Sequence, residues 1–348
     1  MALPGRIRDA VLRPQQGAEN ASTSKSKPVI DDWDSIRVAN SSESGQQTMM
    51  LSDGRQLGFA IYGASSGNTV FYFHGLGDCR ITGAWFDQAG KQLGARIVGV
   101  DRPGLGLSSP LLNRTASDFA DDIRQLAAHL EVKSYGIIGV SGGGPYALAC
   151  AHKLPEEELK SVAIVCVMGP FDMSMRHFSW APWLLYRLYV MFPFVLRWTH
   201  SKMLVQLKNT PTEKFVQETR TKMRSWQTWP WRLIMPSNKD FSLFQDEEFL
   251  TLTFTALQES NKQGVEGFMG EWRVLASRNL GFELEEVRKD LPLQLWYGKQ
   301  DANVPWKIGE EMAKRLGDNA QLYLKDEAHL SLILNWRYQI LEKVLERM

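Results

Sequence analysis

The feature that most constrains the fold is an alternation of short apolar, β-rich runs with stretches of helical character. The runs are VFYF (70–73), RIVGV (96–100), YGIIGV (135–140), SVAIVCV (161–167), LQLWYG (293–298) and AQLYL (320–324). Apolar strands that alternate with helices are typical of a parallel sheet covered on both faces. The pattern therefore predicts an α/β fold with a mostly parallel, doubly wound sheet.

One spacer breaks this regularity, because Val167 and Leu293 lie much too far apart for a single crossover helix. A structureless loop of that length is implausible in a compact domain. We therefore predict an inserted helical cap over residues 170–288, which divides the α/β core into residues 47–169 and 289–348.

The chain before the first parallel run divides into two parts. Residues 1–46 are rich in Ser, Gln, Asn and Lys and have too little apolar content to offset the entropy of ordering them, which predicts a mobile polar tail. The pair Asp53-Gly54 then separates two short runs, a pattern that indicates two antiparallel strands joined by a tight turn.

The composition indicates which binding partners and which cellular compartment to expect. With 40 basic and 39 acidic side chains the net charge is +1, so no broad field attracts nucleic acid, and we expect no such partner. The three cysteines are odd in number and lack metal-ligand spacing, which favours a reducing compartment and no metal. The N-terminal residues contain no continuous apolar run, so we expect a cytoplasmic protein, with a mitochondrial presequence as the lesser alternative.

The strongest local motif is Gly139-Val140-Ser141-Gly142-Gly143, which follows the run YGIIGV and precedes the helical stretch PYALACAHKL. A nucleophile elbow needs this order, because a sharp turn between strand and helix projects the serine above the sheet and requires small residues on either side. The alternative is a glycine-rich turn without chemistry. The context favours Ser141 as the nucleophile.

A serine hydroxyl needs a base to accept its proton, and the base needs a carboxylate to orient it. His329 follows the last apolar run and precedes the final helix, so it is the best placed histidine for the base. Asp301 follows LQLWYGKQ and gives the chain order Ser, Asp, His. Two alternatives stay open: Asp301 as the N-cap of the next helix, and Asp172 as the acid.

Acyl transfer also needs two backbone N–H donors for the developing oxyanion. Gly142, directly after the nucleophile, is the first candidate. The segment His74-Gly75-Leu76-Gly77 follows the first parallel run, and its Leu76 N–H is the second candidate. We assign His74 a structural role.

Five segments, HGLGDCR, DRPGLGLSSP, GVSGGGPYALACA, YGKQDANVP and EAHLSL, occur in this order. Together they resemble the α/β-hydrolase superfamily, in its capped, single-chain serine hydrolase (esterase/lipase-like) branch. Epoxide hydrolases and haloalkane dehalogenases, which are related capped enzymes of the superfamily, carry Asp as nucleophile, so Ser141 argues against both reactions. The resemblance implies cleavage of an ester, thioester, lactone or carbon–carbon bond, a mainly structural role for the DRPGLG loop, and no cofactor.

The stretch from Trp180 to Leu207 is the most apolar part of the insertion. Arginines and prolines interrupt it, so a membrane-spanning helix is excluded, and a membrane-surface helix stays an alternative that we do not favour. A cap helix packed over the active-site mouth is the preferred interpretation. Trp183 and Trp229 are the candidate substrate contacts.

The functional hypothesis is a serine hydrolase that cleaves a carboxylic ester, thioester or lactone of an apolar small molecule through an acyl-enzyme on Ser141. The alternative keeps the same triad in a lyase, cyclase or acyltransferase of small-molecule metabolism, because the fold and triad alone do not fix the reaction. A binding protein without turnover is disfavoured, since it would not need Ser141, Asp301 and His329 together.

Overall fold

A computed structural model describes residues 46–111, 113–178, 180–226, 237–277 and 280–348. The tail predicted for residues 1–46 lies outside this range except for its last residue, and Trp229 lies outside it as well. The helix that contains Asp172 is described, but the side chain of Asp172 is not.

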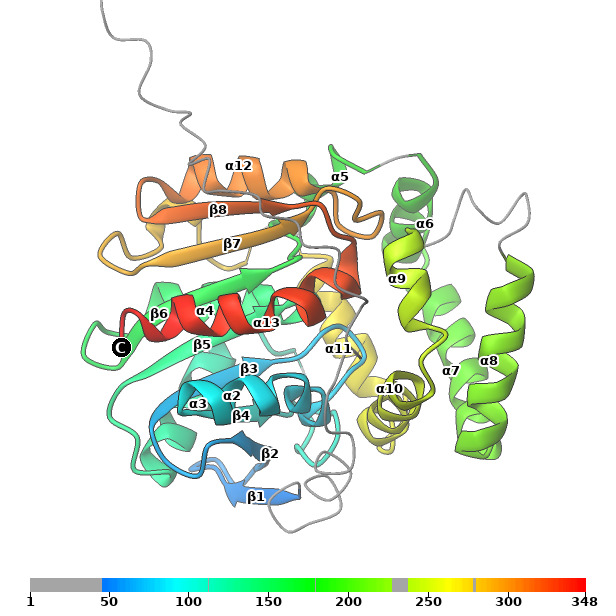
Figure 1. The fold of residues 1–348 in the computed structure, drawn as a ribbon, viewed down its shortest axis with the longest axis horizontal. Helices are drawn as coiled ribbons and strands as arrows, with labels where there is room; N and C mark the ends of the chain where they lie inside the picture. Colours follow the sequence, from blue (N-terminus) through cyan, green and yellow to red (C-terminus); the bar gives the residue numbers. More distant parts are fainter. Residues whose placement is uncertain (1–45, 112, 179, 227–236, 278–279) are drawn as a thin grey trace, which may run out of the picture.

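The centre of the molecule is an eight-stranded sheet with the order β1-β2-β4-β3-β5-β6-β7-β8 (Figure 1). The strands are β1 (Gln47–Met50), β2 (Gln56–Gly63), β3 (Asn68–Phe73), β4 (Ala95–Val100), β5 (Tyr135–Val140), β6 (Leu159–Val165), β7 (Leu293–Gly298) and β8 (Ala320–Lys325). Strand β2 runs antiparallel to β1 and to β4, and the remaining pairs are parallel. The predicted fold class and the predicted turn at Asp53-Gly54 are therefore confirmed.

The register of the central strands brings their carboxyl ends together. Val140 of β5 lies opposite Val165 of β6, which in turn lies opposite Trp296 of β7. Strand β6 ends two residues before the predicted end, because Cys166 has a φ of 53°, a left-handed conformation that cannot continue a strand. The loops that follow β5, β6 and β7 consequently meet at one edge of the sheet.

Alternate residues of each strand enter different cores, as a period of two requires. In β3, Phe71 and Phe73 join a cluster with helices α3 and α4, whereas Val70 and Tyr72 join a cluster with α2 and α13. Helix α12 belongs to the first cluster. The helices are η2 (Arg80–Phe86), α2 (Asp87–Leu93), α3 (Ala116–His129), η3 (Ser141–Gly143), α4 (Gly144–Lys153), α12 (Trp306–Leu316) and α13 (His329–Leu345). The sheet is thus covered on both faces.

Between β6 and β7 the described residues form helices and no strand. They are α5 (Phe171–Met175), α6 (Trp180–Met191), α7 (Pro193–Asn209), α8 (Thr212–Trp226), α9 (Asn238–Leu243), α10 (Glu247–Ser260), α11 (Glu266–Leu275) and η5 (Leu284–Glu286). Figure 1 shows α6 to α10 beyond the carboxyl ends of the parallel strands. Among the described helices, none combines the length and the apolar character needed to cross a bilayer.

Candidate active site

Ser141 stands at the turn between β5 and α4 with a φ of 47°. Non-glycine residues avoid this region, and such strain persists only where the surrounding structure enforces it. The enforcement comes from close packing behind the turn, because a Cβ atom added at Gly143 would lie 2.3 Å from the carbonyl oxygen of Phe73. The motif therefore has the geometry of a nucleophile elbow.

His329 and Asp301 complete a chain of hydrogen bonds that starts at Ser141. The Ser141 Oγ lies 3.1 Å from His329 Nε2, and His329 Nδ1 lies 2.7 Å from Asp301 Oδ2. The other carboxylate oxygen, Oδ1, accepts the backbone N–H groups of Asn303 at 2.8 Å and Val304 at 2.9 Å. Asp301 thus contacts both the histidine and its own loop, whereas the N-cap residue of α12 is Pro305 and not Asp301. Proton transfer from Ser141 to His329 would require this geometry.

The electrostatic surroundings suit His329 for the role of base. Burial favours the neutral imidazole, but the charge and hydrogen bond of Asp301, together with the charge of Asp240, outweigh it and raise the pKa of His329 above its ordinary value. A more basic imidazole is a better acceptor for the serine proton.

The two candidate oxyanion donors, the backbone amides of Leu76 and Gly142, belong to residues beside Ser141. A Cβ atom at Gly142 would lie 2.6 Å from the Leu76 nitrogen, so only glycine leaves space in front of that amide. In the described part of the chain, no acceptor pairs with the Leu76 N–H. Leu76 and Gly142 both line the pocket that contains Ser141.

Arg102 and Glu271 hold the loop that carries Leu76. The Arg102 guanidinium donates to the carbonyl oxygens of His74 at 2.6 Å and Gly75 at 2.9 Å. Glu271, on helix α11 of the insertion, pairs with Arg102 and also accepts the Gly77 N–H at 3.2 Å. The Arg102 and Glu271 side chains are buried. Through Arg102, the DRPGLG loop holds the segment that carries Leu76, the candidate oxyanion donor. Sequence analysis missed Glu271, since no motif surrounds it.

Asp240 is the second supporting carboxylate that sequence analysis missed. It belongs to α9 of the insertion, yet it accepts the backbone N–H groups of His329 and Leu330, both at 3.1 Å, and of Ser331 at 2.8 Å. These are the first amides of α13, so Asp240 takes the place of an N-cap supplied from a distant segment. His329 is consequently anchored by the insertion as well as by Asp301.

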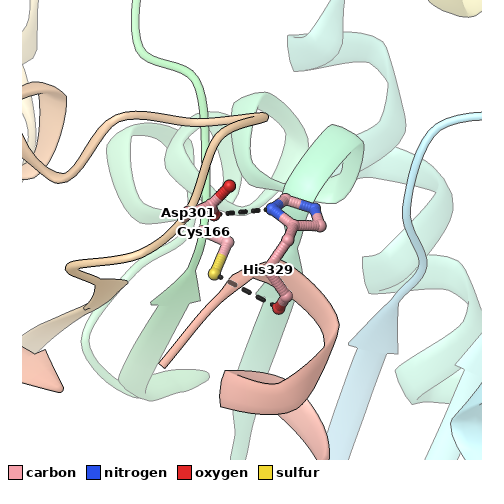
Figure 2. Close-up of side chains that lie close together, drawn as sticks. All are labelled: Cys166, Asp301 and His329. Atoms are coloured by element: carbon pink, nitrogen blue, oxygen red, sulfur yellow. Dashed lines mark hydrogen bonds and ion pairs between the residues drawn. The ribbon is translucent and has the colours of Figure 1, made fainter. Parts of the chain in front are cut away.

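Cys166 lies next to this pair and raises the question of a metal site. Figure 2 shows Asp301 directed at the imidazole of His329, with Cys166 beside them, and possible ligand atoms of all three lie within 4.8 Å of one another. A tetrahedral ion would hold its nitrogen and oxygen ligands about 3.3 Å apart, whereas His329 Nδ1 and Asp301 Oδ2 are 2.7 Å apart. Burial also raises the pKa of the Cys166 thiol, which keeps it protonated. The three residues fit a hydrogen-bonded pair beside a thiol and do not fit a metal centre.

A cavity of about 290 Å³ opens at Ser141 and His329. Its lining is mostly apolar and includes Leu76, Trp85, Met168, Tyr186, Trp272, Leu275, Val304 and Ile333, with Asp78 and Asn303 as polar members. Trp183, the expected substrate contact, is half exposed on α6 and is absent from the described lining. The aromatic walls come instead from Tyr186, three residues further on, and from Trp85 and Trp272.

Comparison with known proteins agrees with this fold. A family model for the alpha/beta hydrolase fold matches residues 68–335. Similar solved structures include an esterase from Exiguobacterium antarcticum (17% identity, TM-score 0.56, 86% of this chain and 98% of that one). Another is a bromoperoxidase from Bacillus anthracis (16% identity, TM-score 0.61, 86% of this chain and 100% of that one). A third is a meta-cleavage product hydrolase from Pseudomonas fluorescens (18% identity, TM-score 0.57, 86% of this chain and 96% of that one).

The chain therefore belongs to the alpha/beta hydrolase family, and it is an enzyme of that class. At these identities the solved structures establish the shared fold, and the substrates of those proteins are not transferred to this chain.

Proposed function

We propose that this chain is a serine esterase that cleaves carboxylic esters of small apolar molecules through an acyl-enzyme on Ser141. The observation that carries the proposal is the unbroken chain from Ser141 Oγ through His329 to Asp301, which opens into an apolar pocket beside the Leu76 amide. Thioesters and lactones present the same carbonyl to the same groups.

The reaction follows from these contacts. His329 Nε2 accepts the Ser141 proton while Oγ attacks the carbonyl carbon, and the Leu76 and Gly142 amides stabilise the oxyanion. His329 then returns the proton to the departing alkoxide, which leaves as an alcohol. A water molecule, deprotonated by the same imidazole, releases the acid and restores Ser141. Asp301 stays ionised and stabilises the imidazolium in both steps.

The size of the pocket limits the substrate. A volume of about 290 Å³ is at the lower end of the roughly 300–1,000 Å³ usual for ligand sites. Each methylene that reaches the apolar wall should contribute about 0.8 kcal/mol, or a factor of about four in kcat/KM, until the space is filled. Short and medium acyl chains are therefore the preferred substrates.

The test is a series of p-nitrophenyl esters from acetate to palmitate. We expect kcat/KM to rise with the first methylenes and then to fall, and Ser141→Ala to abolish turnover while the circular dichroism spectrum is unchanged. Hydrolysis by Ser141→Ala at the original rate, or a profile that ignores chain length, would reject the proposal. Added methanol separates the acyltransferase alternative, because preferential transfer to the alcohol over water would replace the esterase assignment.

A further inference from the structure

Helices α6 and α7 present an unusually apolar outer surface. Twelve large hydrophobic side chains are exposed among the described residues, and all except Met50 lie between Trp180 and Val205. Scattered exposed hydrophobic residues are normal in a monomer, but a contiguous group marks an interaction site. We call the exposed side of α6, Phe192 and α7 the α6–α7 face.

Helix α7 has two distinct sides. Leu196, His200 and Leu204 are buried against the rest of the insertion. Phe194, Trp198 and Val205 are spaced four and seven residues apart, so they form one outward stripe, and they are 66%, 63% and 59% exposed. The inner side packs on the insertion, and within the outer stripe the described ring contact joins Phe194 to Phe192, which is itself exposed.

Helix α6 is arranged in the same way. Trp180, Leu184 and Met191 recur at helical spacing and are exposed. Tyr186 points the other way, stacks on Trp272 with ring centroids 5.6 Å apart, and lines the catalytic pocket. One helix therefore separates the active site from the exposed apolar face.

Charge distinguishes this surface from an ordinary apolar patch. The sequence from residue 173 to residue 212 contains no Asp or Glu but includes Arg176, Arg187, Arg197, Lys202 and Lys208. Arg197, Lys202 and Lys208 flank the α7 stripe, and all three are exposed. Arg197 pairs with Glu266 of α11 at 2.5 Å, whereas Lys202 has no acidic partner among the described residues. The α6–α7 face thus combines exposed tryptophans with a positive rim.

We propose that the α6–α7 face docks on the surface of a lipid bilayer that contains anionic lipids. Tryptophan and phenylalanine favour the boundary between headgroups and acyl chains, and lysine and arginine bind the anionic headgroups. A second copy of the chain fits less well, because a symmetric dimer would place the same positive rims against one another. The proposal does not depend on the esterase reaction.

The position of Tyr186 determines how far the catalytic pocket would lie from the bilayer when the protein is docked. Because α6 lies between the face and the pocket, a docked molecule holds its catalytic pocket one helix diameter, about 10 Å, from the headgroup region. Hydrophobic substrates that partition into membranes would then be concentrated near Ser141.

The test is co-sedimentation of the full chain with vesicles made of equal parts phosphatidylcholine and phosphatidylserine. We expect binding to these vesicles, much weaker binding to pure phosphatidylcholine, and a loss of at least tenfold in the Phe194→Glu, Trp198→Glu double variant. Lys202→Ala should weaken binding by roughly fivefold. Met50→Glu is the matched control, since Met50 is 66% exposed on β1, outside the face. It should bind like the original chain.

Circular dichroism spectra of the variants verify that they are folded, and none of the substituted residues lines the pocket. Absence of vesicle binding by the original chain, or unchanged binding by the double variant, overturns the proposal. Equal binding to pure phosphatidylcholine contradicts the role of the positive rim. If the original chain is a dimer that the double variant dissociates, and vesicles are not bound, the face joins two copies and the proposal is wrong.

Discussion

The sheet and the helical insertion contribute to the active site in different ways. The loops at the carboxyl ends of β5 and β7 and the start of α13 carry the hydrogen-bonded residues Ser141, Asp301 and His329, to which we assign the reaction. The insertion contributes two buried carboxylates, Asp240 and Glu271, which hold the backbone beneath His329 and Leu76. The insertion therefore helps to hold the backbone of the candidate active site. Separate substitutions in the two regions should have separable effects.

The largest effect is expected in the core. Asp301→Asn should lower kcat by about 10⁴-fold, because it destabilises both the required tautomer of His329 and the imidazolium. Steady-state kinetics with p-nitrophenyl butyrate measures the loss, and Asp172→Asn is the control. A mild effect at position 301 together with a severe one at 172 would transfer the role of the acid to Asp172.

In the insertion, Glu271 should matter most for stability. Glu271→Gln leaves the buried Arg102 guanidinium without a charged partner, so the free energy of unfolding should fall by about 3–5 kcal/mol. Urea denaturation measures it. The control is Glu346→Gln, which breaks an exposed pair with Lys343 and should cost less than about 1 kcal/mol. Equal costs for the two variants would show that Glu271 does not support the loop.

Two substitutions of Asp240 separate its anchoring of the α13 backbone from the effect of its charge on His329. Asp240→Ala removes the acceptor for three amides of α13 and should lower kcat roughly 10- to 100-fold, because His329 is displaced. Asp240→Asn retains an acceptor but removes a charge that raises the pKa of His329. With that pKa lowered, the neutral base persists to lower pH, so the acidic limb of kcat/KM should move to lower pH.

The matched control is Asp246, which caps α10 in the same insertion by accepting the N–H groups of Glu248 and Phe249. Asp246→Ala should reduce stability and leave the pH profile where it was. If Asp240 had a purely structural role, Asp240→Asn would also leave the pH profile of kcat/KM where it was. An acidic limb that does not shift in Asp240→Asn would therefore establish a purely structural role.

These supporting residues mark the limit of what the sequence could predict. Strands β5 and β7 coincide with the predicted runs, and the order Ser141, Asp301, His329 placed three distant residues at one edge, because strand period and topology are local rules. Asp240 and Glu271 depend on how the insertion packs, which no local pattern encodes. Helices α6 and α7 are apolar on both sides, so periodicity could not indicate that Trp183 is half exposed and that Tyr186 lines the pocket.

The smallest effect is expected at Asp78, on the wall of the pocket. Burial raises the pKa of Asp78 to about 7, so its carboxyl group is neutral below that pH and charged above it. A charge beside an apolar substrate weakens binding, and KM for p-nitrophenyl butyrate should rise severalfold as the pH passes upward through 7. Asp78→Asn should make KM independent of pH in this range. An unaltered pH dependence in the variant would assign the effect to another group.

The central claim is that Ser141 is the nucleophile, and a fluorophosphonate tests it most directly. The reagent should inactivate the enzyme in proportion to the formation of a single adduct, and mass spectrometry of the digested protein should place that adduct on the peptide containing Ser141. His329→Ala should slow labelling by orders of magnitude, since the serine proton then has no acceptor. An adduct on any other residue, or full turnover by completely labelled enzyme, would contradict the account.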